Sequence, residues 1–400
     1  MERVEQAVIL AGGLGTRLRP FTEGSPKPLY PVGGRPFIDY LLYQMRDWGI
    51  TRVLLLLGYK AEQIVAHVQQ HPVEGLSVEF DTMPPEYDTA GRLAHARPLL
   101  DSAFLLSYCD NYCPVNYAAH AAAFLSGNEL VRLCTYANAD GYTKSNLRVE
   151  SDGKVLVYDK LRRTAGLAGV DIGYALIRRE ALDLLPASTA DVNFEAAVYP
   201  RALELGRLYA TMTEHRYYSV GGWERMPLTE LFFTNPPTAF LDRDGTLNVR
   251  PPKACYVETP EQFIWLPRAR EAVAALKQRG WRVILVSNQP GIARGNFDVT
   301  TLDAIHAKMQ AELRQVGGEI DAIYYCPHGW DDGCTCRKPA PGMLYMAQKD
   351  FCLDLTKCVL IGDDERDIIA GEAAGCHCMR VDESYSLADA VANLLKGHDA

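Results

Sequence analysis

The chain has 400 residues, of which 48% are hydrophobic and 23% are charged, and this length and composition favour two or three globular domains. A formal charge of -9 without a basic stripe argues against nucleic acid as a partner. No apolar run approaches the roughly 20 residues of a membrane span, and no signal peptide is evident, so we expect a cytoplasmic protein without a membrane partner.

Short apolar runs alternate with helix-period segments along the whole chain, which predicts sheets covered by helices on both faces. In the first series we expect strands at residues 7–10, 53–57, 104–108 and 131–135, and helices at 37–48 and 61–69. In the second we expect strands at residues 239–241, 282–286, 322–325 and 358–361, and helices at 268–279 and 301–316. Paired prolines mark residues 234–238 as the linker. The fold class is therefore α/β, with two doubly wound domains at 1–234 and 235–400.

The loop after the first expected strand combines glycines with two cations. Residues 11–28 read AGGLGTRLRPFTEGSPKP. Glycine lets backbone N–H groups approach a phosphate or a base closely, and Arg17 and Lys27 supply charge for phosphate oxygens. No Gly-Lys-Ser/Thr follows, so the loop is not a P-loop, and the Pro-Lys-Pro segment does not fit a dinucleotide fingerprint. The loop predicts a triphosphate site of another kind.

From Gly12 to Pro36 the chain resembles, nearly position by position, the signature of the sugar-1-phosphate nucleotidyltransferases. The resemblance implies a Rossmann-like domain with a mixed sheet, in which Arg17 and Lys27 act on the phosphates. The nucleotide-binding residues that it implies are Ala11, Gly12, Gly13, Gly15, Thr16 and Gly91. The resemblance implies Asp110 as the ligand of Mg²⁺. It implies Lys160, Asp171 and Glu195 as contacts to the sugar phosphate.

Two positions depart from that family's pattern. Ser219 stands where the family usually has an aspartate that binds metal, and a hydroxyl is a poor substitute for a carboxylate on a hard cation. Asp171 stands where an asparagine is common. The family's reaction is in-line attack of a sugar 1-phosphate oxygen on the α-phosphorus of a nucleoside triphosphate, which needs positioning and charge neutralisation. One alternative is therefore a transferase half that has lost catalysis and binds sugar phosphate as a regulatory module.

In the second half, residues 240–248 read FLDRDGTLN and place two carboxylates at the end of an expected strand. Because strand residues two apart share a face, Asp242 can attack phosphorus while Asp244 protonates the leaving group and then activates water. Further polar residues follow in order at later loops and strand ends: Ser287, Asn288, Lys338 and Asp363. This order resembles the haloacid dehalogenase phosphatases, and the resemblance implies Mg²⁺ held by Asp242, Asp244 and Asp363.

Eleven cysteines in a cytoplasmic chain indicate metal ligands or buried thiols rather than disulfides. Four soft or borderline ligands fall within eleven residues: Cys326, His328, Cys334 and Cys336. Such a closed set predicts a structural Zn²⁺ site. Together with the following Arg-Lys-Pro, the element resembles the histidinol-phosphatase and heptose-bisphosphate-phosphatase branch, in which a zinc loop stands in place of a cap domain.

Two features of the sequence distinguish the two kinds of phosphatase in that branch, and they point to different ones. Residues 288–295 read NQPGIARG, which resembles the heptose-bisphosphate phosphatases, whereas the five-residue gap within the zinc loop is more typical of the histidinol phosphatases. We weight the first feature more because it adjoins the phosphate site. Arg294 and Arg337 are candidates to hold a distal phosphate or hydroxyl of the substrate.

The two halves together resemble a fusion of a heptose 1-phosphate guanylyltransferase-like enzyme with a D-glycero-D-manno-heptose-1,7-bisphosphate 7-phosphatase. The resemblance implies removal of the 7-phosphate by the second half and nucleotidyl transfer to heptose 1-phosphate by the first. GTP is chosen by analogy, since guanylyl transfer accompanies the α-anomer in that pathway. The alternatives are another sugar bisphosphate or histidinol phosphate as substrate, and the sequence leaves open whether the chain forms a homo-oligomer.

Overall fold

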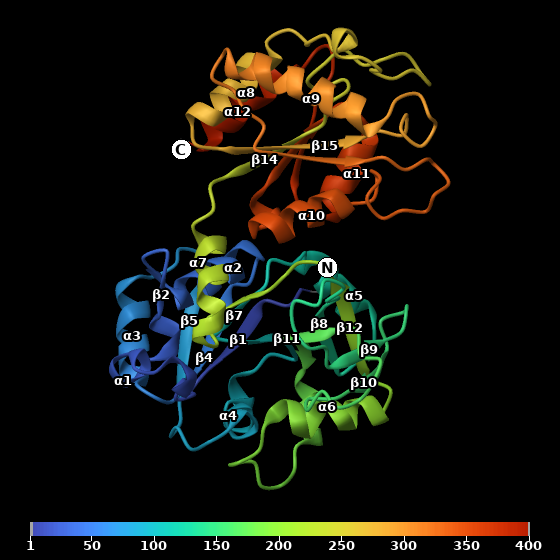
Figure 1. Cartoon of the computed structure of the whole chain (residues 1–400). Helices are drawn as coiled ribbons and strands as arrows, with labels where there is room; N and C mark the ends of the chain where they lie inside the picture. The colour runs from blue at the N-terminus through green and yellow to red at the C-terminus, as the bar shows by residue number, and fades with distance from the viewer. Residues whose placement is uncertain (1–2, 399–400) are drawn as a thin grey trace. The chain divides into compact units, whose positions relative to one another are not determined.

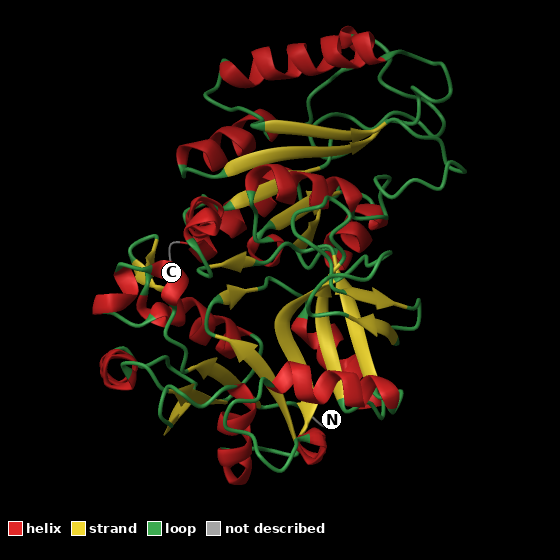
Figure 2. Ribbon diagram, turned by 60° about the horizontal axis from the view of Figure 1, so that its bottom comes forward, coloured by secondary structure: helices red, strands yellow, loops and turns green. Residues whose placement is uncertain are grey.

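The computed structural model describes residues 3–398 and divides into two compact units, the first ending at Phe233 and the second beginning at Thr234. In each unit strands form the centre and helices lie outside them (Figures 1 and 2). None of the described helices has the length and apolar character needed to cross a membrane.

The first unit contains a seven-stranded sheet that is parallel except for one strand. Strand β11 runs antiparallel to both of its neighbours, β6 and β8. In sheet order the strands are β12 (Leu208–Thr213), β8 (Val131–Tyr136), β11 (Val170–Arg178), β6 (Ala103–Tyr108), β1 (Gln6–Ala11), β4 (Arg52–Leu57) and β5 (Ser77–Thr82). Every residue of β1 is buried, as expected for a central strand covered on both faces.

Helices and short strand pairs surround this sheet. The helices are α1 (Phe21–Gly24), α2 (Phe37–Asp47), α3 (Ala61–Gln70), α4 (Thr89–His95), α5 (Tyr117–Ser126), α6 (Phe194–Glu204) and α7 (Met226–Phe233). The short pairs are β2 (Pro31–Val32) with β3 (Arg35–Pro36), β7 (Asn111–Tyr112) with β13 (Tyr218–Ser219), and β9 (Leu147–Val149) with β10 (Val155–Tyr158). Side chains of Asp88, Asn116 and Asn193 cap α4, α5 and α6, which fixes where these helices begin.

The second unit contains a five-stranded, fully parallel sheet. In sheet order the strands are β16 (Ala322–Cys326), β15 (Arg282–Asn288), β14 (Thr238–Leu241), β17 (Val359–Gly362) and β18 (His377–Arg380). Its helices are α8 (Ala269–Gln278), α9 (Val299–Arg314), α10 (Gly342–Phe351), α11 (Glu365–Ala373) and α12 (Leu387–His398). Helices α8, α9 and α12 cover one face of this sheet, and α10 and α11 cover the other (Figure 1).

Successive side chains of β14 point to opposite faces of the sheet, which explains why helices cover both faces. Ala239 and Leu241 pack into the core beneath α8, α9 and α12, whereas Phe240 packs into the core beneath α10. The expected strands and helices of both halves are confirmed, with ends that differ by at most two residues. Burial on both faces leaves the strand ends for polar chemistry, and in parallel sheets of this kind ligands bind at the carboxyl ends.

Candidate active sites

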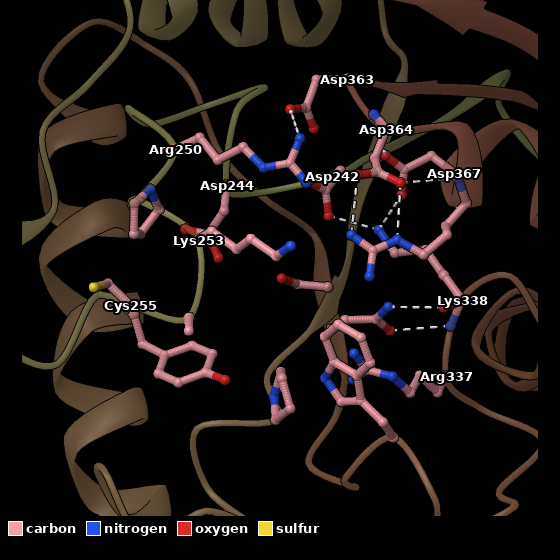
Figure 3. Close-up of a pocket in the computed structure, with 18 of the residues that line it drawn as sticks. Asp242, Asp244, Arg250, Lys253, Cys255, Arg337, Lys338, Asp363, Asp364 and Asp367 are labelled. Carbon is pink, nitrogen blue, oxygen red and sulfur yellow. Dashed lines mark hydrogen bonds and ion pairs between the residues drawn. The ribbon is translucent and has the colours of Figure 1, made fainter.

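The second unit places its polar motifs at the ends of three neighbouring strands. Because β15, β14 and β17 are adjacent and parallel, their carboxyl ends meet at one edge. Asp242 follows β14, Ser287 and Asn288 end β15, and Asp363 follows β17. These residues line a pocket of about 540 Å³. In Figure 3 the carboxylates gather at one end of this pocket and Arg337 lies toward the other.

A buried lysine connects the carboxylates. The Lys338 ammonium lies 2.5 Å from Asp242 Oδ1 and 2.6 Å from Asp367 Oδ1, and donates to the Val286 carbonyl at 2.8 Å. Asn288 holds the lysine's backbone, since its amide donates to Lys338 O at 2.9 Å and accepts from Lys338 N at 3.0 Å. Burial alone would lower the pKa of Lys338, but Asp242 and Asp367 raise it above its ordinary value. The lysine is therefore cationic at the point where a phosphoryl group would be neutralised.

Three carboxylates converge beside this lysine. One oxygen each of Asp242, Asp363 and Asp367 lies within 4.8 Å of the others. Asp363 Oδ1 is buried and accepts no hydrogen bond, so a divalent cation would supply the partner that it lacks. The residues therefore fit a Mg²⁺ site. The sequence reasoning missed Asp367. It lies in the first turn of α11, four residues after Asp363, and so at the same edge of the sheet as the other carboxylates.

Asp244 is held away from this group. Its carboxylate accepts from Arg243 at 2.9 Å, from Asn248 at 3.0 Å and from Gln289 at 3.1 Å, and Gln289 also donates to Ser287 Oγ at 2.8 Å. Burial would raise the pKa of Asp244, but Arg243 and these donors lower it below its ordinary range. Asp244 and Ser287 thus share one hydrogen-bond network. The structure does not bring the Asp244 side chain into the metal-ligating group.

Gly245 makes room for that group. It has a φ of +102°, and a Cβ there would lie 2.1 Å from Asp363 Oδ2. We expect Gly245→Ala to displace Asp363 and to lower phosphatase kcat/KM by about 100-fold, with partial recovery at high Mg²⁺. Gly280→Ala is the matched control, because Gly280 also has a positive φ, of +75°, but nothing lies within 4 Å of its Cβ position. Equal losses in both variants would show that backbone strain alone matters.

The cysteine cluster has the geometry of a zinc site. The Cys326 Sγ lies 3.6 Å from Cys334 Sγ and 3.5 Å from His328 Nδ1, and His328 Nδ1 lies 3.3 Å from Cys336 Sγ. Ligands at Zn–N and Zn–S bond lengths of about 2.0 and 2.3 Å are separated by about 3.5 Å around a tetrahedron. All four ligand atoms lie within 4.8 Å of one another, so this group fits a closed structural Zn²⁺ site.

This fit gives a direct prediction. We expect about one Zn²⁺ per chain in the protein, and less than about a tenth of that in Cys336→Ser, since three remaining ligands bind much more weakly. Metal content by mass spectrometry and the unfolding temperature of the second unit would both fall. Cys255→Ser is the control, because Cys255 is exposed and lies outside the cluster. Unchanged zinc content in the Cys336 variant would rule out the site.

The outer part of the same pocket contains the two arginines that the sequence suggested. Arg294 donates to the Tyr256 hydroxyl at 2.8 Å, and Arg337 follows the cluster residue Cys336 directly. Sequence reasoning missed Arg250, which pairs with Asp363 at 2.9 Å and with Asp364 at 2.5 Å (Figure 3). An arginine nine residues after a strand end carries no local indication of that contact.

The first unit brings its glycine loop and Asp110 together. The loop follows β1, Asp110 lies just beyond β6, and these strands are parallel neighbours. Lys27 forms an ion pair with Asp110. The predicted residues that line the resulting cavity of about 460 Å³ are Gly12, Gly13, Gly15, Thr16, Arg17, Lys27 and Asp110. Ala11 and Gly91 are buried in β1 and α4, and neither is among the residues lining the cavity.

A buried arginine that the sequence reasoning missed supports this cavity. Arg92 on α4 donates to the carbonyls of Leu57, Met83 and Pro84, with the last bond at 2.8 Å. A Cβ at Gly12 would lie 2.3 Å from its guanidinium carbon, so Gly12 is required by this close approach. The only indication of Arg92 in the sequence is its position next to Gly91.

The predicted sugar-phosphate residues form a separate cluster. Lys160 pairs with Glu195 at 2.7 Å, and Asp171 accepts from the Tyr158 hydroxyl at 3.2 Å. Burial and the nearby Glu195 raise the pKa of Asp171 to about 7. The structure thus brings Lys160, Asp171 and Glu195 together, and Tyr108, which lines the cavity, lies beside Glu195.

Ser219 lies next to Asp110 in the fold. It pairs with Asn111 across β13 and β7, and its hydroxyl accepts from the Gly221 backbone N–H at 2.9 Å. Among residues 3–398, no group of three metal-ligating side chains includes Asp110. Any cation here would therefore depend on oxygens from the bound triphosphate, as is common for Mg²⁺.

Fold and sites define two classes of enzyme in one chain: a nucleotidyl transferase in the first unit and a phosphatase of the haloacid dehalogenase type in the second. Comparison with known families agrees. The family described as "Nucleotidyl transferase" matches residues 6–139, and the "HAD-hydrolase-like" family matches residues 335–395.

Known proteins resemble each part. The chain is 48% identical over 136 residues to the D-glycero-β-D-manno-heptose-1,7-bisphosphate 7-phosphatase of Bordetella bronchiseptica, covering 34% of this chain and 75% of that protein. The protein of the same name from Pseudomonas aeruginosa is 43% identical, with the same coverage. A structure of a glucose-1-phosphate thymidylyltransferase from Bacillus anthracis, itself assigned by inference, shares the fold at 17% identity, with a TM-score of 0.51, covering 56% of this chain and 93% of that one. The chain therefore belongs to the family of D-glycero-β-D-manno-heptose-1,7-bisphosphate 7-phosphatases and carries a nucleotidyl transferase domain in addition.

Proposed function

We propose that this chain catalyses two consecutive steps on one sugar: removal of the 7-phosphate from D-glycero-D-manno-heptose 1,7-bisphosphate, then transfer of a nucleotidyl group to heptose 1-phosphate. The observation that carries the first step is the Lys338 ammonium between Asp242 and Asp367 at the phosphatase edge. Relatives with 48% and 43% identity support the choice of heptose. We place both steps in the cytoplasm.

In the phosphatase step Asp242 is the nucleophile. One of its oxygens forms a bond to the phosphorus of the 7-phosphate while the bond from phosphorus to the sugar oxygen breaks. Asp244 gives a proton to the departing sugar oxygen, then takes one from the water that attacks the phospho-aspartate and releases phosphate. To act as an acid Asp244 must exchange its present donors for the substrate. Ser287, Asn288 and Lys338 bind the phosphoryl oxygens.

A divalent cation supplies charge neutralisation at the phosphoryl group when it is bound at this edge. Asp242, Asp363 and Asp367 would hold it, and they are the side chains that the structure groups together. Arg250, which pairs with both Asp363 and Asp364, would then release Asp363 and keep its pair with Asp364. Zn²⁺ bound by Cys326, His328, Cys334 and Cys336 would hold the loop of residues 326–336 in place, a structural role outside the reaction.

In the transferase step the loop after β1 and the Arg17 and Lys27 side chains hold the triphosphate. An oxygen of heptose 1-phosphate forms a bond to the α-phosphorus, and the bond to the bridging oxygen of pyrophosphate breaks. Lys160, Asp171 and Glu195 are proposed to bind the sugar phosphate. Mg²⁺ on Asp110 would neutralise the phosphates, in a site completed by their own oxygens.

GTP is our proposed nucleotide, by analogy with guanylyl transfer to the α-anomer. The relatives are named for the β-anomer of the bisphosphate, so they give no support for GTP as the nucleotide that this chain uses. Pyrophosphate release with both anomers of heptose 1-phosphate and with GTP, ATP, CTP and UTP tests this point. We expect a preference for GTP. A preference for another nucleotide would overturn the proposal of guanylyl transfer, and the proposed phosphatase activity would stand.

Ser219 favours a second candidate, in which the first unit binds sugar phosphate without catalysing transfer. Its hydroxyl already accepts a hydrogen bond from the Gly221 backbone N–H, and it offers no carboxylate beside Asp110. A lack of pyrophosphate release with every nucleotide, combined with retained binding of heptose 1-phosphate, would establish this candidate. Phosphate release from a panel of sugar bisphosphates and histidinol phosphate tests the substrate of the other half, and equal rates on histidinol phosphate would exclude the heptose assignment.

A further inference from the structure

The outer wall of the phosphatase pocket contains an exposed tryptophan that packing does not require. Trp330 is 63% exposed and lines the same pocket as Asp242. It lies in the loop between His328 and Cys334, so both sides of its backbone are fixed by cluster residues. A large aromatic ring held at this degree of exposure in a pocket is available for contacts with ligands or with cations.

Two guanidinium groups lie over this indole. The Arg294 guanidinium carbon is 5.5 Å from the ring centroid and that of Arg337 is 5.7 Å from it. Arg294 is also held by Tyr256, because its Nη1 donates to the Tyr256 hydroxyl at 2.8 Å. The negative face of an indole attracts cations, so one ring can hold together two like charges that would otherwise separate.

Both arginines keep their charge available. Arg250 and Arg366 pair with Asp364, and Lys338 pairs with Asp242 and Asp367. In contrast, neither Arg294 nor Arg337 forms an ion pair with a carboxylate anywhere in residues 3–398. Their side chains donate hydrogen bonds to the Tyr256 hydroxyl and, at 3.4 Å, to the His328 carbonyl. Planar guanidinium groups with open donors match phosphate oxygens.

We propose that Trp330 is a positioning residue, which holds Arg294 and Arg337 as a paired site for the phosphate that is not hydrolysed. This inference rests on the proposed phosphatase function and adds a basis for its substrate preference. Through Trp330, the zinc loop would set the preference for bisphosphates over monophosphates. The pocket then has two anion sites, one at Lys338 for the reacting phosphate and one at Arg294 and Arg337 for the other.

The test separates binding of the second phosphate from catalysis. In Trp330→Ala we expect KM for heptose 1,7-bisphosphate to rise about 30-fold while kcat changes less than about twofold, and KM for heptose 7-phosphate to change less than about twofold. Trp330→Phe keeps an aromatic face and should recover most of the loss. Trp223→Ala, at an exposed tryptophan of the first unit, is the control.

A second measurement does not depend on heptose as the substrate. Fructose 1,6-bisphosphate and inorganic phosphate are used as competitive inhibitors of p-nitrophenyl phosphate hydrolysis. The Ki of the bisphosphate should rise about 30-fold in Trp330→Ala, and that of phosphate should stay within about twofold. Equal changes for both inhibitors, or no change for either, overturn the proposal. Failure of the wild-type enzyme to hydrolyse heptose bisphosphate overturns the proposed substrate instead, and leaves this readout intact.

Discussion

Asp242→Asn should abolish phosphate release from heptose 1,7-bisphosphate, with a loss on the order of 10⁴-fold or more, because an amide cannot form the phospho-aspartate. The fold should survive, since Lys338 keeps Asp367 at 2.6 Å as a partner for its buried charge. Release of phosphate is measured directly. Pyrophosphate release by the first unit, assayed with supplied heptose 1-phosphate and a nucleoside triphosphate, serves as the internal control and should be unchanged.

Asp367→Asn distinguishes a nucleophile from a metal ligand. Asp367 belongs to the same carboxylate group, but it lies on α11, whereas the proposed nucleophile Asp242 directly follows β14. We expect its loss to weaken Mg²⁺ binding by about 10- to 100-fold, and high Mg²⁺ to restore most of the activity. High Mg²⁺ should restore nothing in Asp242→Asn. Comparable recovery of both variants would show that Asp242 acts only through the cation.

Lys27→Met should lower pyrophosphate release by about 10³-fold, because it removes the charge nearest Asp110 from the triphosphate cavity. Arg17→Ala should lower it by a similar factor, since Arg17 is exposed to the same cavity. Phosphatase activity should not change in either variant. Arg19→Ala is the matched control, because Arg19 is two residues away but does not line the cavity. Wild-type pyrophosphate release by Lys27→Met would exclude its role in transfer.

Local motifs predicted the parts of the two sites that depend on short segments. The strand-end position of Asp242, and the order in which Ser287, Lys338 and Asp363 follow it, can be read from sequence because parallel strands bring their carboxyl ends to one edge. The zinc ligands could be predicted for a similar reason, since all four lie within eleven residues.

Contacts between distant segments could not be predicted in this way. Arg92 reaches the carbonyl of Leu57, and Arg250 reaches Asp363 across more than a hundred residues, without a local pattern that indicates either contact. The orientation of Asp244 is a further case. Residues two apart on a strand share a face, but Arg243, Asn248 and Gln289 draw its carboxylate away from the metal-ligating group.

The central claim is that one chain both removes a phosphate from a heptose bisphosphate and activates the product. Product analysis by mass spectrometry, with heptose 1,7-bisphosphate, Mg²⁺ and a mixture of nucleoside triphosphates, tests it most directly. We predict three products from the purified protein: inorganic phosphate, pyrophosphate and a nucleotide-linked heptose with no remaining 7-phosphate. Phosphate and heptose 1-phosphate alone, without pyrophosphate or a nucleotide-linked sugar, would contradict the claim.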